Sequence, residues 1–484
     1  MLHFPGQFLK SRIRSSQTSK RCYPDAIRSP IPNDGNHIMD RNEFKRFFRA
    51  CNPSKTIWIE RPEDKDYYID FTSVRGTDIV EQLGETISLL SPDPTCQLFT
   101  GHIGCGKSTE LLRLKFELEK QGFVVVYIDT RDDLEMGDVD VTDVLLAIAQ
   151  KVLDTLEQQS LNLKPGYFNE LLEQCVQFLL TPIELKAEME FNPEISFLGA
   201  KVNLGKIVAK TKDSPQMRDR LRDYLEPKTN TLLQAINGDL IQPANLQLQK
   251  QGKEGLVIII DSLDRVDNRK RSDDKSAVEY LFITRGEQLK ELKCHVVYTI
   301  PLVLMFSNER EALKQRLGGG NAPMVLPMVP VKLADGQNCE KGLELLRQAI
   351  LARAFPKLSP KQRRDRITEV VDRPETLDRL CGISGGHVRN LLSLLFRCLQ
   401  QSKQLPITRD RLEIAIRQER DDLMLAITEL EWELLKKVSQ TKKVTGEDEY
   451  QILLRSLFVF EYRTNEFGRW FDLNPLLEDA PELT

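Results

Sequence analysis

Short, mostly apolar runs recur along the first two thirds of the chain, and longer segments with a helical repeat separate them. The runs lie at residues 96–100, 123–128, 256–260 and 295–300. Between them, apolar residues return every three or four positions, as in 108–118, which is the spacing of an amphipathic helix. Uninterrupted apolar strands that alternate with helices are typical of a parallel sheet covered on both faces. We therefore expect an α/β fold.

The pattern changes beyond residue 335. Helical spacing dominates residues 336–405, for which we expect a helical lid. Residues 406–484 contain further helical segments and then a predicted hairpin at 458–473, an order typical of a winged-helix domain. The last apolar segment before this change, 324–331, is interrupted by prolines and is expected at the sheet edge.

A glycine-rich segment stands where the first apolar run meets its helix. It reads Gly-His-Ile-Gly-Cys-Gly-Lys-Ser and then Thr, and it fits the pattern G-x-x-x-x-G-K-[ST]. In such a loop, backbone N–H groups and a helix N-terminus hold phosphates, the lysine reaches the β- and γ-phosphates, and the serine hydroxyl is a ligand for Mg²⁺. We expect ATP and Mg²⁺ as ligands, bound by Gly101, His102, Ile103, Gly104, Cys105, Gly106, Lys107, Ser108 and Thr109.

A pair of carboxylates follows the third apolar run. The sequence after it is Asp261-Ser262-Leu263-Asp264. A carboxylate at the end of a buried strand can polarise the Mg²⁺ shell, so Asp261 and Ser108 are the predicted metal residues. Position 262 is serine rather than glutamate, and Asp264 is therefore the carboxylate expected to orient or deprotonate the attacking water.

Three further positions could complete the site, each with a simpler alternative. Thr299 ends the fourth run and either senses the γ-phosphate or is a solvent-facing strand end. Arg389 follows a Gly-Gly turn, and it either leans over the triphosphate or forms a salt bridge. Val74, Arg75 and Gly76 precede the helix before the phosphate loop, where they either contact the adenine or form a helix-capping turn.

The predicted domains follow from these motifs. Residues 39–335 form the P-loop NTPase domain, interrupted at about 181–250 by an insertion with a hairpin around Gly199 and then helices. One insertion helix carries three arginines that either reach a neighbouring subunit's γ-phosphate or pair with nearby acids: Arg218, Arg220 and Arg222. Residues 1–38 are expected outside the fold, as a transit peptide, a disordered tail or an upstream extension before Met39.

Composition limits the other classes of function. With 68 basic and 72 acidic residues the net charge is −4, so the chain as a whole is not a polycation for nucleic acid. No apolar run approaches the length of a membrane span, and we predict none. The nine cysteines lack paired metal-ligand spacing, which favours a reducing, cytoplasmic location. Cys105 is either a redox reporter or a tolerated small residue.

The C-terminal segment leaves two kinds of partner open. Its basic side chains could contact DNA phosphates, but acidic neighbours dilute them, so a protein-docking role fits equally well. The basic residues are Lys436, Lys437, Lys442, Lys443, Arg455, Arg463 and Arg469.

In their order along the chain, the phosphate loop, the Asp-Ser-Leu-Asp strand end, the Gly-Gly-x-x-Arg helix start and the terminal hairpin resemble the AAA+-related STAND and KAP-like signalling ATPases. They are also similar to the origin-recognition initiator ATPases. Val388 stands where many STAND proteins have proline. The resemblance implies a slow, ATP-gated switch, an effector or sensor on another polypeptide, and assembly as a homo-oligomer if an arginine completes the site in trans.

Three functions remain after this reasoning. The first is a regulatory ATPase that couples its nucleotide state to domain rearrangement. The alternative is a DNA-binding AAA+ ATPase of the initiator or transposition-helper type. The third, kept open by Ser262, is a pseudo-ATPase scaffold that binds nucleotide without turnover.

Overall fold

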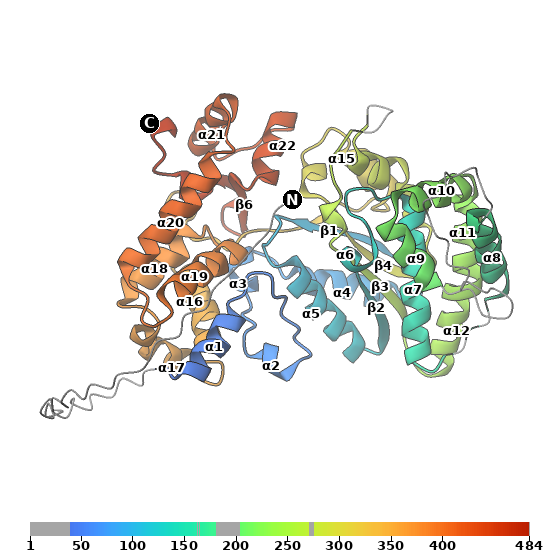
Figure 1. The fold of residues 1–484 in the computed structure, drawn as a ribbon, viewed down its shortest axis with the longest axis horizontal. Helices are drawn as coiled ribbons and strands as arrows, with labels where there is room; N and C mark the ends of the chain where they lie inside the picture. The colour runs from blue at the N-terminus through green and yellow to red at the C-terminus, as the bar shows by residue number, and fades with distance from the viewer. Residues whose placement is uncertain (1–38, 162, 164, 181–203, 271–274, 484) are drawn as a thin grey trace, which may run out of the picture. The chain divides into compact units, whose positions relative to one another are not determined.

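A computed structural model describes residues 39–483 except 162, 164, 181–203 and 271–274 (Figure 1). Five strands form one parallel sheet in the order β2-β3-β4-β1-β5, which confirms the predicted α/β class. The strands are β1 (Cys96–Gly101), β2 (Phe123–Asp129), β3 (Gly255–Asp261), β4 (His295–Thr299) and β5 (Met324–Leu326). The proline-broken segment supplies β5, which lies at the sheet edge as expected.

The strands are apolar throughout because both faces of the sheet are covered. Helices α4 (Ile79–Leu90) and α5 (Lys107–Lys120) pack on one face, against side chains such as Val257 and Ile259. Helix α7 (Val141–Gln158) and the insertion helices pack on the other face (Figure 1). Because the strands are parallel, their carboxyl ends meet at one edge, where the register sets Asp129 beside Asp261.

The insertion is helical in its described part. Its helices are α9 (Leu204–Asp213), α10 (Pro215–Leu225), α11 (Thr229–Ala235) and α12 (Gln242–Lys250), and helix α8 (Gly166–Leu180) precedes it. The hairpin predicted around Gly199 lies outside the described residues.

Two of the three arginines on α10 pair with acids of their own chain. Arg218 Nε lies 3.0 Å from a carboxylate oxygen of Asp138, and an Arg222 amino group lies 2.9 Å from the other oxygen. Arg222 also pairs with Asp143. Acid-paired arginines are the simpler of the two sequence predictions, although Arg218 and Asp143 are buried and their partners are half-buried instead of forming a solvated face.

The remaining helices precede the sheet, connect its strands or follow it. They are α1 (Arg41–Ala50), α2 (Pro62–Lys65), α3 (Thr72–Arg75), α6 (Thr130–Asp133), α13 (Ala277–Glu279), α14 (Gly286–Lys290), α15 (Arg310–Arg316), α16 (Glu340–Ala354), α17 (Pro360–Asp365), α18 (Pro374–Ile383), α19 (Val388–Ser402), α20 (Arg409–Met424), α21 (Glu429–Thr441) and α22 (Asp448–Arg455). The helices expected in residues 336–405 are present, and this segment is called the lid below, although its role as a lid stays a prediction. The three helices expected after it precede a hairpin. Whether that C-terminal segment is a winged-helix domain stays a prediction.

The hairpin packs into the core instead of projecting from it. It consists of β6 (Val459–Thr464) and β7 (Gly468–Leu473), paired antiparallel. Its aromatic side chains Phe460, Tyr462 and Trp470 are buried in the same cluster as Phe99 of β1 and Leu111 of α5. The C-terminal segment therefore contributes directly to the hydrophobic core beneath the phosphate loop.

Candidate nucleotide-binding site

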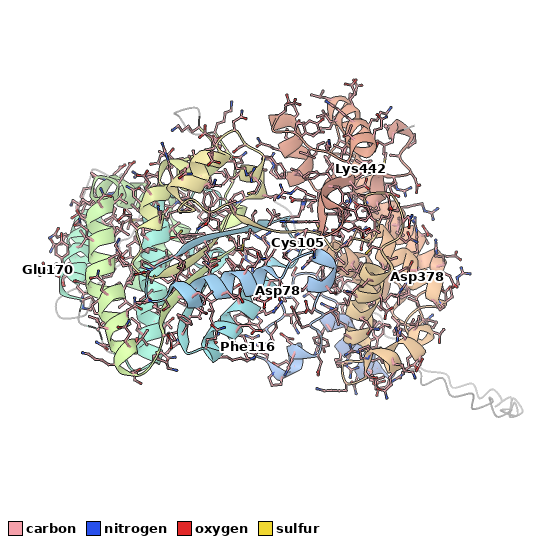
Figure 2. The ribbon with its side chains drawn as sticks, turned by 180° about the vertical axis from the view of Figure 1, so that it is seen from behind. Asp78, Cys105, Phe116, Glu170, Asp378 and Lys442 are labelled. Carbon is pink, nitrogen blue, oxygen red and sulfur yellow. The ribbon has the colours of Figure 1, made fainter. Side chains whose placement is uncertain are left out.

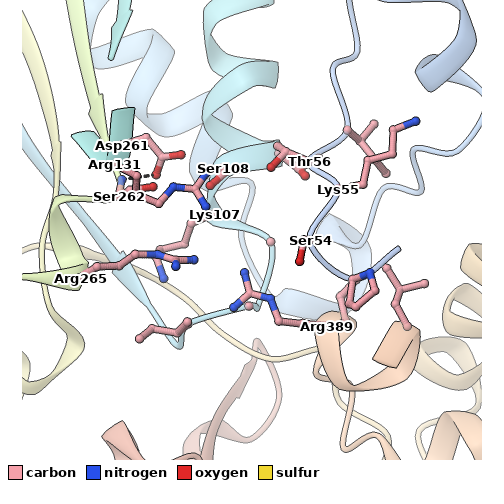
Figure 3. Close-up of a pocket in the computed structure, with 18 of the residues that line it drawn as sticks. Ser54, Lys55, Thr56, Lys107, Ser108, Arg131, Asp261, Ser262, Arg265 and Arg389 are labelled. Atoms are coloured by element: carbon pink, nitrogen blue, oxygen red, sulfur yellow. Dashed lines mark hydrogen bonds between the residues drawn. The ribbon is translucent and has the colours of Figure 1, made fainter. Parts of the chain in front are cut away.

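A cavity of about 300 Å³ opens at the carboxyl ends of β1 and β3 (Figure 3). The phosphate loop and the end of β3 form one side, and the loop 53–57 and the start of α19 form the other. Its lining carries six cationic and two acidic side chains, a net charge of +4: Lys55, Lys107, Arg131, Arg265, Arg353, Arg389, Asp261 and Asp264. A concave site with this charge fits a polyanion.

The phosphate loop divides between the cavity and the protein interior. Six of its nine predicted residues line the cavity, namely Ile103, Gly104, Gly106, Lys107, Ser108 and Thr109. The other three lie behind it, and all are buried: Gly101, His102 and Cys105. Cys105, labelled in Figure 2, is 0% exposed, which fits a small packing residue better than a redox reporter.

The Lys107 ammonium is held by three acceptors. It donates to the carbonyls of Gly101 at 2.7 Å and His102 at 2.9 Å, and it lies 3.0 Å from a carboxylate oxygen of Asp264. Burial is the largest single influence and would lower the pKa of Lys107, but the charge and hydrogen bond of Asp264, together with smaller effects of Cys105 and Asp261, outweigh it, so on balance the pKa is raised. Lys107 is therefore a fixed positive charge at the floor of the cavity.

The start of α19 holds two further carbonyls of the loop. His387 caps this helix, because its Nδ1 accepts from the Asn390 N–H at 3.0 Å. Nδ1 is thus an acceptor, so Nε2 carries the proton and donates to the Ile103 carbonyl at 2.7 Å. The Arg389 N–H donates to the Gly104 carbonyl at 3.3 Å. The lid helix and the phosphate loop are therefore joined through two loop carbonyls.

Arg75 holds the next carbonyl of the loop. Its guanidinium donates to the Cys105 carbonyl at 2.8 Å and is 3% exposed. Val74 is buried among lid residues, and Gly76 lies against the backbone of the hairpin turn at Asn465. None of these three predicted adenine contacts lines the cavity. These residues lie behind the loop, where the Arg75 guanidinium is bonded to the Cys105 carbonyl and Gly76 packs against the hairpin turn.

The Asp261 carboxylate stands at the end of β3, as predicted. It accepts from the Tyr127 hydroxyl at 2.6 Å and from the Ser262 N–H at 2.7 Å. Burial raises the pKa of Asp261, and hydrogen bonds from Ser108 and Tyr127 offset part of that rise. The serine hydroxyl and the carboxylate are hard oxygen donors beside each other, a set that suits Mg²⁺ with phosphate and water completing the shell.

Thr299 does not line the cavity, and it does not face solvent either, so neither of the two predicted roles matches its place in the structure. The residue is fully buried, and its hydroxyl donates to the Ile260 carbonyl at 3.1 Å and accepts from the Leu263 N–H at 3.0 Å. Ser262 adopts the left-handed conformation with φ of 65°, so the chain turns sharply after Asp261. Thr299 satisfies the backbone of that turn, and it positions Asp264 indirectly.

Three arginines from separate elements point into the cavity. Arg131 follows β2, Arg265 follows Asp264, and Arg389 belongs to the lid (Figure 3). Arg131 is paired with Asp129, with its Nε 2.9 Å from a carboxylate oxygen. Burial lowers the pKa of Arg389, and the nearby charges of Arg265 and Arg131 lower it further. Because these guanidinium groups repel one another, the binding of an anion between them would be favourable.

Sequence reasoning identified Arg389 but missed several neighbours. Arg131 lies two positions after the strand-end carboxylate of Asp129, and Arg265 four positions after that of Asp261, which is a usable signal. Gly104 is a second signal, because the phosphate-loop pattern does not require glycine at this position. The structure shows why glycine is present: a Cβ would lie 2.8 Å from the His387 ring. The loop 53–57 offers no comparable pattern.

The His102 side chain points away from the cavity to the hairpin. Its Nε2 accepts from the Glu461 N–H at 2.9 Å. The Phe460 ring packs edge-on against His102 and is stacked on His387. Burial lowers the pKa of His102 to about 3, so the ring is neutral at ordinary pH. The hairpin thus contacts both the phosphate loop and the residue that joins the loop to the lid.

Within the described residues, no helix is long and apolar enough to cross a membrane. Nor do three or more histidine, cysteine, aspartate or glutamate side chains gather there in a way that could hold a metal ion.

No family model matches the chain, and no curated protein does. Similar solved structures include the ORC2 protein of Aeropyrum pernix in its ADPNP–ADP complexes, at 12% identity over 90% of this chain and 95% of that chain, with a TM-score of 0.38. A Walker-type ATPase of Pyrococcus abyssi matches at 11% identity over 88% and 98%, with a TM-score of 0.39. Cdc6p of Pyrobaculum aerophilum matches at 13% identity over 87% and 96%, with a TM-score of 0.32.

Proposed function

We propose that the protein is a Mg²⁺-dependent ATPase of the AAA+-related kind whose nucleotide state is coupled to the lid and the C-terminal hairpin. The observation that carries the proposal is the cavity itself, where a phosphate loop with Lys107 faces Asp261 and Asp264 within a lining of net charge +4. The reaction is the attack of water on the γ-phosphorus, with release of ADP, inorganic phosphate and a proton.

The loop supports phosphate binding through its backbone. A trans peptide directs its C=O and N–H to opposite sides. Because His387 and Arg75 hold the Ile103 and Cys105 carbonyls, the N–H groups of the following residues, Gly104 and Gly106, point the other way and remain for phosphate oxygens.

Lys107 and Asp264 divide the chemistry between them. Lys107 exchanges one of its three acceptors for a phosphate oxygen, and the natural one to lose is Asp264. The carboxylate released by that exchange orients the attacking water. Ser108 and Asp261 hold Mg²⁺, which supplies charge neutralisation at the β- and γ-phosphates. Arg131, Arg265 and Arg389 add positive charge from the same chain.

The base side of the cavity is the loop 53–57 together with Val388 and Leu392 of α19. Apolar side chains and backbone groups of this kind can enclose a planar base. We assign the adenine to this side in place of residues 74–76, which lie behind the loop.

Nucleotide titration and phosphate release by the full chain test the proposal. The wild type should bind Mg·ATP and release phosphate, and Lys107→Ala should weaken binding by at least about tenfold. Asp264→Asn should retain nucleotide and lose about 10²-fold in turnover. Lys120→Ala, at the exposed far end of α5, is the matched control and should behave as wild type. Binding without turnover in the wild type would leave the pseudo-ATPase alternative, and absence of binding would refute the proposal.

The second candidate, a DNA-binding ATPase of the initiator or transposition-helper type, draws on the exposed basic residues of the C-terminal segment. Lys436, Lys437, Lys443 and Arg463 are exposed, whereas Arg469 is paired with the buried Glu461 at 2.9 Å. An experiment with charge-reversed variants should therefore leave Arg469 unchanged and replace Lys436, Lys437, Lys443 and Arg463 by acidic residues. Duplex retention that these changes leave intact would exclude the second candidate.

Assembly and an effector on another chain belong to the same proposal. Light scattering of the full chain with Mg²⁺ and ADP, and then with a non-hydrolysable ATP analogue, measures assembly directly. A mass increase seen only with the analogue, and lost in Lys107→Ala, would establish a nucleotide-gated homo-oligomer. An unchanged monomer would restrict the switch to movements within one chain.

A further inference from the structure

His387 is placed where the lid, the phosphate loop and the hairpin meet. Its ring is fully buried, its Nε2 donates to the Ile103 carbonyl at 2.7 Å, and the Phe460 ring is stacked on it at a centroid distance of 5.6 Å. Burial lowers the pKa of His387 to about 4, so the ring is neutral and keeps one donor and one acceptor nitrogen.

We infer that His387 is a positioning residue of the nucleotide site, which holds the phosphate loop in its anion-binding conformation only while the lid helix is docked. The inference rests on the proposed function and deepens it. His387 does not line the cavity; it acts by fixing the Ile103 carbonyl on the outer side of the loop. Its loss lets that peptide rotate, and the Gly104 N–H then turns away from the phosphates.

The packing around Gly104 supports a dedicated contact. A Cβ at this position would lie 2.8 Å from His387 Cε1 and Nε2 and 2.9 Å from the Arg389 Cβ, and the residue has φ of +91°. Only glycine permits both this backbone and this approach of the lid. The loop is therefore shaped to receive the His387 ring, beyond what phosphate binding alone requires.

The alternative is that His387 merely caps α19. The two nitrogens separate these roles, because Nδ1 makes the cap and Nε2 makes the loop contact. Asparagine can place an acceptor near the Nδ1 position and is a good cap residue, but it is too short to reach Ile103. Glutamine can place an N–H near the Nε2 position and is a poorer cap. The two substitutions therefore remove one function each.

The test compares His387→Asn and His387→Gln in the full chain by titration with Mg·ADP and with a non-hydrolysable Mg·ATP analogue. For a positioning residue, the Asn variant should lose at least about tenfold in affinity for both nucleotides while it keeps the helix cap. The Gln variant should recover most of that affinity despite a lower Tm. His295→Gln removes a buried histidine of β4 far from the cavity, and it should leave nucleotide affinity unchanged.

Two outcomes would overturn the inference while the proposed function stands. One is wild-type affinity in His387→Asn, and the other is an equal loss in both variants, which would show that a donor at Nε2 is irrelevant. A wild-type chain that binds no nucleotide would instead refute the proposed function, and the inference with it.

Hydrogen exchange of the wild type provides a measurement that does not depend on variant folding. Peptides covering 101–108 and 384–392 should gain protection together when the ATP analogue binds, because loop and lid share the contact. Protection confined to 101–108 would contradict the inference.

Discussion

The buried carboxyl group of Glu461 makes the docking of the hairpin sensitive to pH. Its side chain is 1% exposed, and one oxygen accepts from Arg469 at 2.9 Å. Burial raises the pKa of Glu461 from an ordinary 4.5 to about 7, against the opposing charges of Arg469 and Arg463. His102, which accepts the backbone N–H of Glu461, is neutral over this range because burial lowers its pKa to about 3.

The sign follows from proton binding. Between pH 4.5 and about 7, the folded hairpin binds a proton that the unfolded chain does not, so stability falls as the pH rises. The loss of stability caused by ionised Glu461 is absent below pH 4.5 and complete above about pH 7. A rise from 4.5 to about 7 corresponds to about 3 kcal/mol. Glutamine at 461 keeps an oxygen for Arg469 and carries no such penalty.

Hydrogen exchange of the hairpin peptide 458–473, in wild type and Glu461→Gln at pH 5, 6, 7 and 8, measures the free energy of local opening. The wild type should lose stability relative to the variant by about 2 to 3 kcal/mol over this range, slightly less than the full amount because pH 5 already lies above 4.5. Common effects of pH on exchange cancel in the comparison. Opening free energies that stay parallel across the pH range would refute the reasoning, since Glu461 would then be ionised throughout.

Three further predictions follow from contacts of the site. Gly104→Ala should weaken nucleotide binding by at least about tenfold in calorimetry, because a Cβ meets His387 and φ is +91°; unchanged affinity would contradict it. Thr299→Val should lower the free energy of unfolding by about 1–3 kcal/mol in thermal unfolding, since the Leu263 N–H loses its partner, while Thr299→Ser should retain most of the wild-type stability; an equal loss in both variants would show that the hydroxyl does not stabilise the turn. Arg265→Gln should slow phosphate release about tenfold or more with a smaller effect on ADP affinity; an equal loss of both would make Arg265 a general binding residue.

The strands and the phosphate loop could be predicted because their signals are local. The apolar run before Asp261 specifies a buried strand within a few residues, and the glycine and lysine spacing specifies the loop that follows β1. Thr299 was placed correctly at a strand end, but its direction depends on another segment: the turn after Asp261 leaves Leu263 with an N–H that needs an acceptor.

The contacts behind the loop could not be predicted from such signals. His102 and Glu461 are 359 positions apart, and no periodicity relates them. The prediction of the adenine contacts was wrong for a related reason. Arg75 donates to a carbonyl of the loop and Gly76 packs against the hairpin turn, so neither lines the cavity. Sequence spacing indicates which residues belong to the same helix or strand. Tertiary packing decides which other segments those residues contact.

The same His102 contact has a consequence for protein synthesis. A nascent chain makes its phosphate loop early, but the partner of His102 leaves the ribosome 359 residues later. Until then, the surface that receives Phe460 and Tyr462 has no cover from the hairpin, and it is an apolar patch for chaperones to bind. Full nucleotide affinity is thus expected only after translation has passed the hairpin, which would make ATP binding a sign that the hairpin has docked against the phosphate loop.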